Sequence, residues 1–269
     1  MEAAFFDLDK TIISRSSSLV LSRPMYRAGM VTRGQLVRSA YAQLVYALVG
    51  ADERKMDRLK EGMLRLTKGW DRAEVERLVH EVLVEVIEAF VYQEALDLIA
   101  MHRSEGRAVY VVSSSPEEIV RPLAGHFGVA DVLATRAMIV DGRYTGELEF
   151  YCYGEAKADA IRALGDQHDI DLEASYAYSD SATDLPMLRA VGHPVAVNPD
   201  RELRREAEAQ GWDVRDFRRP VRLRTRIAKT AAHPQTRVTA GVVAAIVAAA
   251  ILGWLVVRSR VGARQTSAA

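Results

Sequence analysis

The sequence predicts an α/β protein in which helices cover both faces of a parallel β-sheet. Short apolar runs of the kind that form buried parallel strands alternate with segments of helical periodicity, which implies strand–helix–strand units. Polar residues follow directly after several of these runs. The chain has 269 residues, 49% of them apolar, and a formal net charge of zero, so it can bury the core of one large domain or two modest ones.

The first strand is expected at residues 3–6, an apolar run that is followed by two acidic residues, Asp7 and Asp9. Side chains at i and i+2 of an extended segment point the same way, so both carboxylates should face one small site where the strand ends. Open α/β sheets bind their ligands at this edge. One acid can then serve as a nucleophile and the other as a proton carrier.

The long block after the first strand shows helical periodicity, with apolar residues three and four apart, for example in residues 36–48. It contains no convincing strand. Because it separates the first and second strands, we expect an insertion that lies over the catalytic edge of the sheet. The predicted organisation is a catalytic core of residues 1–14 and 91–214 with a helical cap of residues 15–90.

The second half of the chain alternates between helices and strands. A strand at 108–112 should stop at the serines that precede Pro116, and Pro116 suits the first residue of the next helix. Asp141-Gly142 is a typical two-residue hairpin turn. The other expected elements are a helix at 93–103, a helix ending near 126, a strand near 129–133, a hairpin over 138–151, a helix at 155–164, a strand at 175–178, a short helix ending at 190, a strand at 194–197 and a helix at 201–210.

Cysteine and histidine give no sign of a disulfide or a metal site. Cys152 is the single cysteine, so no internal disulfide can form, and we expect an inert thiol. The histidines at 80, 102, 126, 168 and 193 lack metal-ligand spacing and are expected at surface or core positions.

The C-terminal part is expected to anchor the protein in a membrane. Residues 238–257 carry no charge and are long enough to cross roughly 30 Å of hydrocarbon as a transmembrane helix. The basic linker before them, 215–237, holds seven arginines and one lysine against one acid, and a short polar tail, 258–269, follows. More positive charge upstream favours a single-pass protein with a cytoplasmic catalytic domain. A buried helix is the alternative for 238–257, and the linker is either an interfacial segment on anionic lipid or a solvated spacer.

Candidate site residues fall at or just beyond the expected strand ends. They are Asp7, Asp9, Thr11, Ser113, Ser114, Lys157, Asp180 and Asp184. Carboxylates and other hard oxygen donors suit magnesium, which keeps several waters and shares its shell with a substrate phosphate. Asp7, Asp9 and Asp180 are therefore the predicted metal ligands.

The remaining candidates suit a phosphate group. Ser113, or its neighbour Ser114, and the amides at the start of the following helix can donate to phosphoryl oxygens, and Lys157 adds a positive charge. Asp184 is expected either to hold this lysine or to complete the outer shell of the metal. Thr11 belongs to the same phosphate site, where a local hydrogen bond would shape the loop.

These motifs, taken in order, resemble those of the haloacid dehalogenase (HAD) superfamily of phosphohydrolases. Asp7-Leu8-Asp9-Lys10-Thr11 matches the first motif, Ser113 the second, Lys157 the third, and the Ser-Asp-Ser-Ala-Thr-Asp segment at 179–184 the fourth. The resemblance covers residues 3–214 and is closest to subfamily IB, the group of the phosphoserine phosphatases. It implies a Rossmann-like core with a C1-type helical cap and magnesium as the cofactor.

The resemblance also implies a mechanism. Asp7 would attack phosphorus and become an aspartyl-phosphate, while Asp9 would protonate the leaving alcohol and then deprotonate the hydrolytic water. Magnesium would be bound by Asp7, the backbone carbonyl of Asp9 and Asp180. Ser113 and Lys157 would hold the phosphoryl charge.

We therefore expect a magnesium-dependent phosphomonoesterase at the cytoplasmic face of a membrane, acting on a small or lipid phosphomonoester and not on nucleic acid. The alternatives are a phosphoserine phosphatase proper, a phosphotransferase, and a membrane-anchored HAD-fold binding protein without turnover. Two features of phosphoserine phosphatases are missing. Ser114-Ser115-Pro116 replaces the glycine pair that follows their second-motif serine. The glutamate that follows their first motif has no counterpart either, because residues 12–18 contain no acid.

Overall fold

The structure, a computed structural model, describes residues 1–17, 26–27, 29, 31–32, 61–62, 64–129 and 131–219, without the side chains of 82–89. The chain divides into two compact units, Met1–Arg222 and Leu223–Ala269. The second unit lies outside the described residues.

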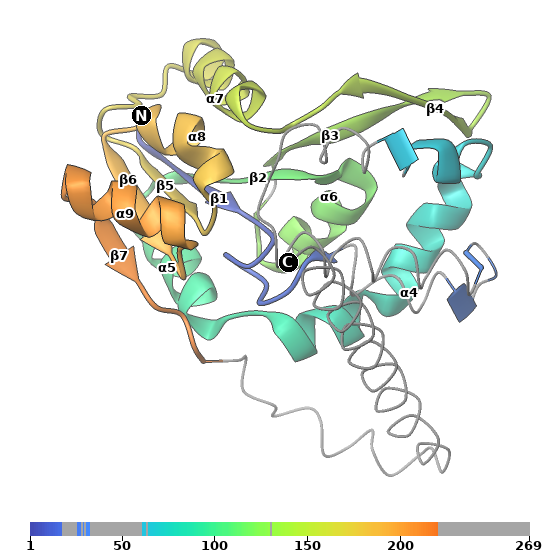
Figure 1. Cartoon of the computed structure of the whole chain (residues 1–269), viewed down its shortest axis with the longest axis horizontal. Coiled ribbons are helices and arrows are strands. Elements are labelled where there is room, and N and C mark those ends of the chain that lie inside the picture. The colour runs from blue at the N-terminus through green and yellow to red at the C-terminus, as the bar shows by residue number, and fades with distance from the viewer. Residues whose placement is uncertain are drawn as a thin grey trace, which may run out of the picture. The chain divides into compact units, whose positions relative to one another are not determined.

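The first unit is built on a seven-stranded sheet with the order β4-β3-β2-β1-β5-β6-β7 (Figure 1). All neighbouring strands are parallel except β3 and β4, which form an antiparallel hairpin. The strands are β1 Ala3–Asp7, β2 Ala108–Pro116, β3 Asp131–Val140, β4 Arg143–Phe150, β5 Tyr176–Ser179, β6 His193–Val197 and β7 Asp213–Arg215. The predicted α/β class with a mostly parallel sheet is confirmed.

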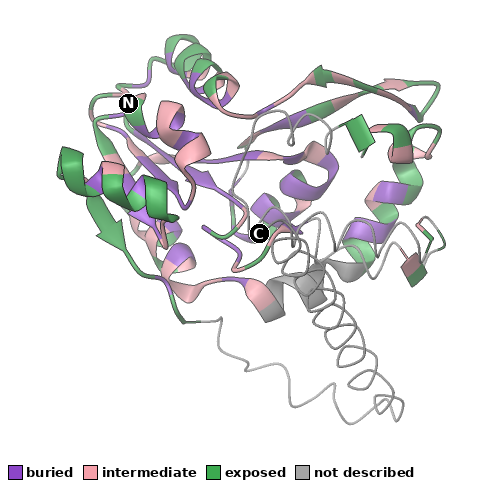
Figure 2. Ribbon diagram, viewed as in Figure 1, coloured by how far each residue is buried: buried purple, intermediate pink, exposed green. Residues whose placement is uncertain are grey.

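Helices cover the sheet on both faces. They are α4 Arg72–Phe90, α5 Gln93–Ser104, α6 Glu117–His126, α7 Glu155–His168, α8 Leu185–Arg189 and α9 Arg201–Gln210, and a 3₁₀ turn lies at Ala182–Asp184. Side chains of α4, α5 and α6 join one hydrophobic cluster, and those of α7, α8 and α9 join the other. The central strands are buried between the two helical layers (Figure 2).

The alternation of side chains along β1 explains why two cores form. Ala4 and Phe6 belong to one cluster, and Ala3 and Phe5 belong to the other. Successive residues of a strand point to opposite faces, so a strand without polar positions must be buried on both sides. Phe6 stacks on Tyr178 with ring centroids 4.3 Å apart. Burial of each phenylalanine stabilises the fold by roughly 1.5–3 kcal/mol.

Several boundaries differ from those predicted. β2 continues to Pro116 because its register against β3 shifts between Ser113 and Pro116, and this irregularity keeps the serines extended. α6 then begins at Glu117, with Pro116 as its N-cap residue and not as its first helical residue. The strand expected near 129–133 is the start of β3, which runs on to the hairpin turn. Asp141 and Gly142 have φ values of 50° and 74°, as the predicted hairpin turn requires.

The insertion leaves and re-enters the core through two segments that lie side by side. Ser14 N donates to Phe90 O at 2.7 Å, and Tyr92 N donates to Ile12 O at 3.0 Å. The parts of the predicted cap at 18–25, 33–60 and single positions between lie outside the described residues. The predicted cap boundaries stay a prediction.

The segment before α4 is also bonded to the β3–β4 hairpin, which extends from the sheet toward α4 (Figure 1). Gly69 N donates to Tyr144 O at 2.8 Å, Tyr144 N donates to Trp70 O at 3.1 Å, and Arg72 N donates to Gly142 O at 2.9 Å. These backbone bonds join the insertion to the core at a second place.

Within the ranges that the structure describes, no helix is long and apolar enough to cross a membrane. The predicted transmembrane helix at 238–257, and the basic linker beyond residue 219, lie outside those ranges.

Candidate active site

Asp7 is the last residue of β1, the central strand, and its side chain is buried. Its Oδ1 accepts a hydrogen bond from Lys157 Nζ at 2.6 Å, and the same ammonium donates to Asp184 Oδ2 at 2.8 Å. Ser179 Oγ also donates to Asp184 Oδ2, at 2.7 Å. Asp184 therefore plays the first of its two predicted roles, since it holds the lysine.

Lys157 reaches Asp7 from the first turn of α7. Gly154, immediately before this helix, has φ 58° and ψ −125°, a combination that residues with a Cβ rarely adopt. Lys157 N donates to Gly154 O at 3.1 Å, so the sharp turn leads directly into the helix. The lysine is only 2% exposed, which excludes water from its bonds to the two carboxylates.

Asp9 has a different set of partners. Its Oδ1 accepts a hydrogen bond from Ser17 N at 2.6 Å. Its Oδ2 accepts from Ser115 Oγ at 2.9 Å and from Ser17 Oγ at 3.2 Å. The two acids of the first motif thus lie in one site, but a lysine holds Asp7 and two serines hold Asp9.

The expected reason for the proximity of these acids is wrong in detail. β1 ends at Asp7, and residues Leu8 to Ile12 form a turn in which Lys10 has φ 65°. Asp9 therefore does not continue the strand. The two carboxyls still interact: burial is the main cause that raises the pKa of Asp7, and the charge of Asp9 is a smaller cause in the same direction.

Asp180 follows β5 and completes the acidic group. Its Oδ2 lies 3.7 Å from Lys10 Nζ, and its backbone oxygen accepts a bond from Asp200 N at 2.8 Å. Burial raises the pKa of Asp180 to about 7, although Lys10 opposes the shift. Burial likewise raises the pKa of Asp7 well above its usual value, with Lys157 opposing and the nearby carboxylates adding to the shift.

This excess of buried negative charge fits a divalent cation. Asp7, Asp180 and Asp184 are buried, Asp9 is half-buried beside them, and Lys157 is the one cation among the described residues that is buried with these acids. Among the described residues, this site included, no three Asp, Glu, His or Cys side chains are arranged to hold a metal by themselves. A magnesium ion bound by two carboxylates, a backbone carbonyl, water and a substrate phosphate needs no such group of three.

The hydroxyls predicted to bind phosphate lie in the same region of the chain's fold. Ser113 is 1% exposed, and its Oγ accepts a bond from Ser115 N at 3.1 Å, which leaves its own O–H as a donor. The carbonyl of Ser114 accepts from Thr135 Oγ1 at 2.8 Å. The local hydrogen bond expected of Thr11 is not made, because its buried hydroxyl has no partner among the described residues.

Sequence reasoning missed three serines of the site. Ser17 and Ser115 bond to Asp9, and Ser179 bonds to Asp184. Pro116, and not Ser115, occupies the N-cap position of α6, so the hydroxyl of Ser115 does not cap that helix. A serine next to a catalytic motif is too common to be singled out, so only the folded chain identifies these residues.

Cys152 and the histidines that the structure describes lie apart from the acids of the site in the hydrogen bonds that they make. Cys152 is buried, and burial raises the pKa of its thiol to about 11, so the reactive thiolate is disfavoured. His102 lies in the core, where its Nε2 is 2.7 Å from the hydroxyl of Tyr178. The histidines at 80, 126, 168 and 193 are exposed.

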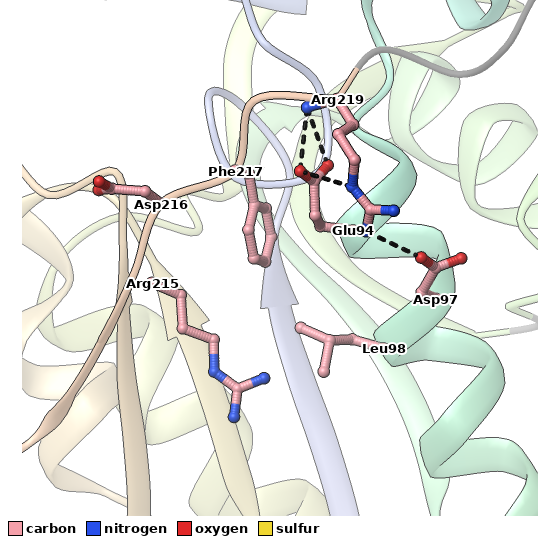
Figure 3. A pocket seen from close by; sticks show the side chains of 7 residues that line it. All are labelled: Glu94, Asp97, Leu98, Arg215, Asp216, Phe217 and Arg219. Atoms are coloured by element: carbon pink, nitrogen blue, oxygen red, sulfur yellow. Dashed lines mark hydrogen bonds and ion pairs between the residues drawn. The ribbon is translucent and has the colours of Figure 1, made fainter.

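A surface groove of about 460 Å³ lies between α5 and the segment after β7 (Figure 3). Arg219 crosses it to Glu94 and Asp97 at 3.1 and 3.2 Å, so its charged side chains already neutralise one another. None of the predicted site residues lines this groove. We therefore do not place the catalytic site there.

Phosphate esters suit the site at the end of β1, because a buried ammonium attracts phosphoryl oxygens and a carboxylate can attack phosphorus. The fold and the site together define a phosphohydrolase with a parallel α/β core. The chain belongs to the haloacid dehalogenase-like hydrolase family, which it matches over residues 4–189.

Relatives of the chain agree with this assignment. A probable phosphatase of Mycobacterium tuberculosis H37Rv is 51% identical over 241 residues, which cover 89% of this chain and 84% of the relative. A phosphoserine phosphatase of the same strain is 34% identical over 218 residues, covering 80% and 71%. A solved structure of a protein of unknown function from Bordetella pertussis Tohama I superposes with a TM-score of 0.70 at 29% identity, covering 80% and 98%. The chain is thus a phosphatase, homologous to phosphoserine phosphatases.

Proposed function

We propose that this phosphatase hydrolyses phosphomonoesters through an aspartyl-phosphate on Asp7, with Asp9 as the proton carrier. The observation that carries the proposal is the unequal environment of the two acids. Asp7 lies against the ammonium of Lys157, whereas Asp9 is bonded to neutral serine donors. Two carboxyl groups in different surroundings can hold different protonation states and take different roles.

In the first step a carboxylate oxygen of Asp7 attacks phosphorus as the bond to the ester oxygen breaks. The ester oxygen keeps the electron pair of that bond and takes the proton of Asp9, so an alcohol leaves. Lys157 and the hydroxyl of Ser113 would stabilise the phosphoryl oxygens, and the contact of Lys157 with Asp7 supports this role for the lysine.

In the second step water attacks the phosphorus of the aspartyl-phosphate. Asp9, now a carboxylate, takes a proton from the water, and the bond between phosphorus and the oxygen of Asp7 breaks. Inorganic phosphate leaves and Asp7 is again a carboxylate. Acid–base assistance of this kind is worth on the order of a hundredfold to ten-thousandfold in rate.

We propose magnesium as the cofactor, held by Asp7, Asp180 and the backbone carbonyl of Asp9. The bound ion would neutralise charge between the phosphate and the buried acids. The support is the excess of buried carboxylates described above and the hard oxygen character of all the donors.

The substrate is proposed to be a small or lipid phosphomonoester met at the cytoplasmic face of a membrane. The support is the uncharged run at 238–257 and the basic segment before it. Phosphoserine is the second candidate substrate. The relative that is named a phosphoserine phosphatase favours it, although Ser114-Ser115-Pro116 replaces the glycine pair of that group.

The test is the hydrolysis of p-nitrophenyl phosphate by the full chain with added magnesium, compared with the Asp7→Asn variant. We expect turnover that is lost in the variant and on chelation by EDTA and that returns with magnesium. Equal turnover by Asp7→Asn would exclude Asp7 as the nucleophile. No turnover across a broad panel of phosphate esters would favour the non-catalytic binding protein.

A second measurement addresses the substrate. Phosphoserine and a lysophosphatidate are compared as substrates, each with and without vesicles of anionic lipid. Faster hydrolysis of the lipid ester when vesicles are present is expected. Preference for phosphoserine under both conditions would identify a phosphoserine phosphatase proper.

A further inference from the structure

Two serines outside the predicted motifs, Ser17 and Ser115, donate hydrogen bonds to the carboxyl group of Asp9. We propose that Ser115 is a positioning residue that orients the carboxyl group of Asp9 toward the leaving-group oxygen, with Ser17 supporting it. This inference rests on the proposed function, in which Asp9 carries the proton.

The hydroxyl hydrogens can be assigned by counting donors. Ser17 Oγ and Ser115 Oγ are 2.8 Å apart, and both lie near Asp9 Oδ2, at 3.2 and 2.9 Å. These three contacts share only two hydroxyl hydrogens. Both of the shorter contacts are hydrogen bonds if Ser17 donates to Ser115 and Ser115 donates to Asp9. Ser115 is then the direct hydroxyl donor to the acid, and Ser17 orients Ser115.

This chain of bonds also fixes the orientation of the Asp9 carboxyl group. Oδ2 accepts a bond from Ser115 Oγ at 2.9 Å, and Oδ1 accepts a bond from Ser17 N at 2.6 Å. Because each carboxylate oxygen offers about two lone-pair positions, the group can still carry a proton while it makes both bonds. Rotation of the carboxyl group would break the bonds to both oxygens at once, so the two serines hold the acid in one orientation.

Ser115 also connects the acid to the phosphate-binding serine. Its backbone N–H donates to Ser113 Oγ at 3.1 Å while its hydroxyl donates to Asp9. Both bonds depend on the extended end of β2, where the register shifts. One residue therefore orients the groups on the phosphoryl side and on the leaving-group side of the reaction. Substitution by alanine would remove the bond to Asp9 and keep the backbone bond to Ser113.

The leaving group provides the test, because a nitrophenolate departs without a proton and an alkoxide does not. We compare kcat/KM for p-nitrophenyl phosphate and for glycerol 2-phosphate in the full chain with magnesium. This parameter covers only the steps up to departure of the alcohol or phenol, so later hydrolysis does not enter. The variants are Ser115→Ala, Ser17→Ala and the conservative Ser115→Thr. Ser104→Ala, at an exposed serine on the last turn of α5, is the control.

We expect Ser115→Ala to lower the ratio of alkyl to aryl kcat/KM by about tenfold or more, since general acid assistance is worth a hundredfold or more. Ser17→Ala should lower it less, Ser115→Thr should restore most of it, and Ser104→Ala should leave it unchanged. The proposal would be overturned if the ratio of alkyl to aryl kcat/KM stayed unchanged in both Ser115→Ala and Ser17→Ala, whether or not both values fell by the same factor. Absence of turnover by the unaltered chain would instead refute the proposed function.

Discussion

His102 provides a test of the core that is independent of the active site. Its side chain is fully buried, with Nε2 2.7 Å from the hydroxyl of Tyr178 and Nδ1 3.2 Å from Nη1 of Arg107. Arginine can only donate, so Nδ1 accepts and the ring hydrogen lies on Nε2. Protonation of Nδ1 would place its N–H against the N–H donor of Arg107. Burial, with the charge of Arg107, lowers the pKa of His102 to about 4.

The expected effect of pH follows from the difference between the folded and unfolded states. An unfolded histidine titrates near pH 6.5, so between pH 6.5 and 4 the unfolded chain binds more protons than the folded chain. The contribution of His102 to stability is complete above pH 6.5 and is lost as the pH falls toward 4. The whole difference is worth about 3 kcal/mol, of which about 2 kcal/mol is lost between pH 7 and 4.5.

The assay is urea unfolding of the full chain at pH 7 and at pH 4.5. Carboxylates also titrate in this range, so the His102→Gln variant, which cannot titrate, is measured beside the unaltered chain. The stability advantage of the unaltered chain should shrink by about 2 kcal/mol at the lower pH. His126→Gln, at an exposed histidine of α6, should show no such change. Parallel pH profiles for the unaltered chain and His102→Gln would refute the reasoning.

Two further predictions concern the buried lysine and the glycines. Lys157→Met should destabilise the protein by about 3–5 kcal/mol, because it leaves two buried carboxylates without their cation. Adding Asp184→Asn should recover part of this stability without restoring turnover, as measured by urea unfolding and phosphatase assay. Gly192→Ala should destabilise strongly, since a Cβ there would lie 1.8 Å from the backbone oxygen of Glu173. Gly125→Ala, in α6 with nothing within 4 Å of a Cβ, should stabilise by up to about 1 kcal/mol.

Each of these outcomes has a clear opposite. No recovery of stability on adding Asp184→Asn would mean that lost packing, and not unpaired charge, explains the effect of Lys157→Met. Similar melting temperatures for Gly192→Ala and Gly125→Ala would show that the loop at Gly192 adapts without cost.

Local signals in the sequence predict some elements to the residue. α9 was expected at 201–210 and is found there. Asp200 caps its first turn by accepting a bond from Leu203 N, and Gly211 ends it with φ 69°. β7 was missed, because three exposed residues at the edge of a sheet carry no hydrophobic pattern. Its place is set by pairing with β6, which is a tertiary contact.

The predicted site residues depend on both kinds of information. Asp7, Lys157 and Asp184 were identified from motif order alone, and the structure brings them together although Asp7 and Lys157 are 150 positions apart. The bond between Ser17 and Ser115 spans 98 positions and has no motif. Nothing near either serine in the sequence indicates the other.

By itself the sequence determined the α/β class and the two-faced burial of the strands, and it singled out the acids that we propose as catalytic. These depend on residue type and on periodicity, which are local properties of the chain. Only the tertiary structure decided how Asp7 and Asp9 are distinguished, because the lysine and the serines that surround them come from distant segments. The chemical role of a carboxyl group is set by its neighbours in space, and packing decides which neighbours those are.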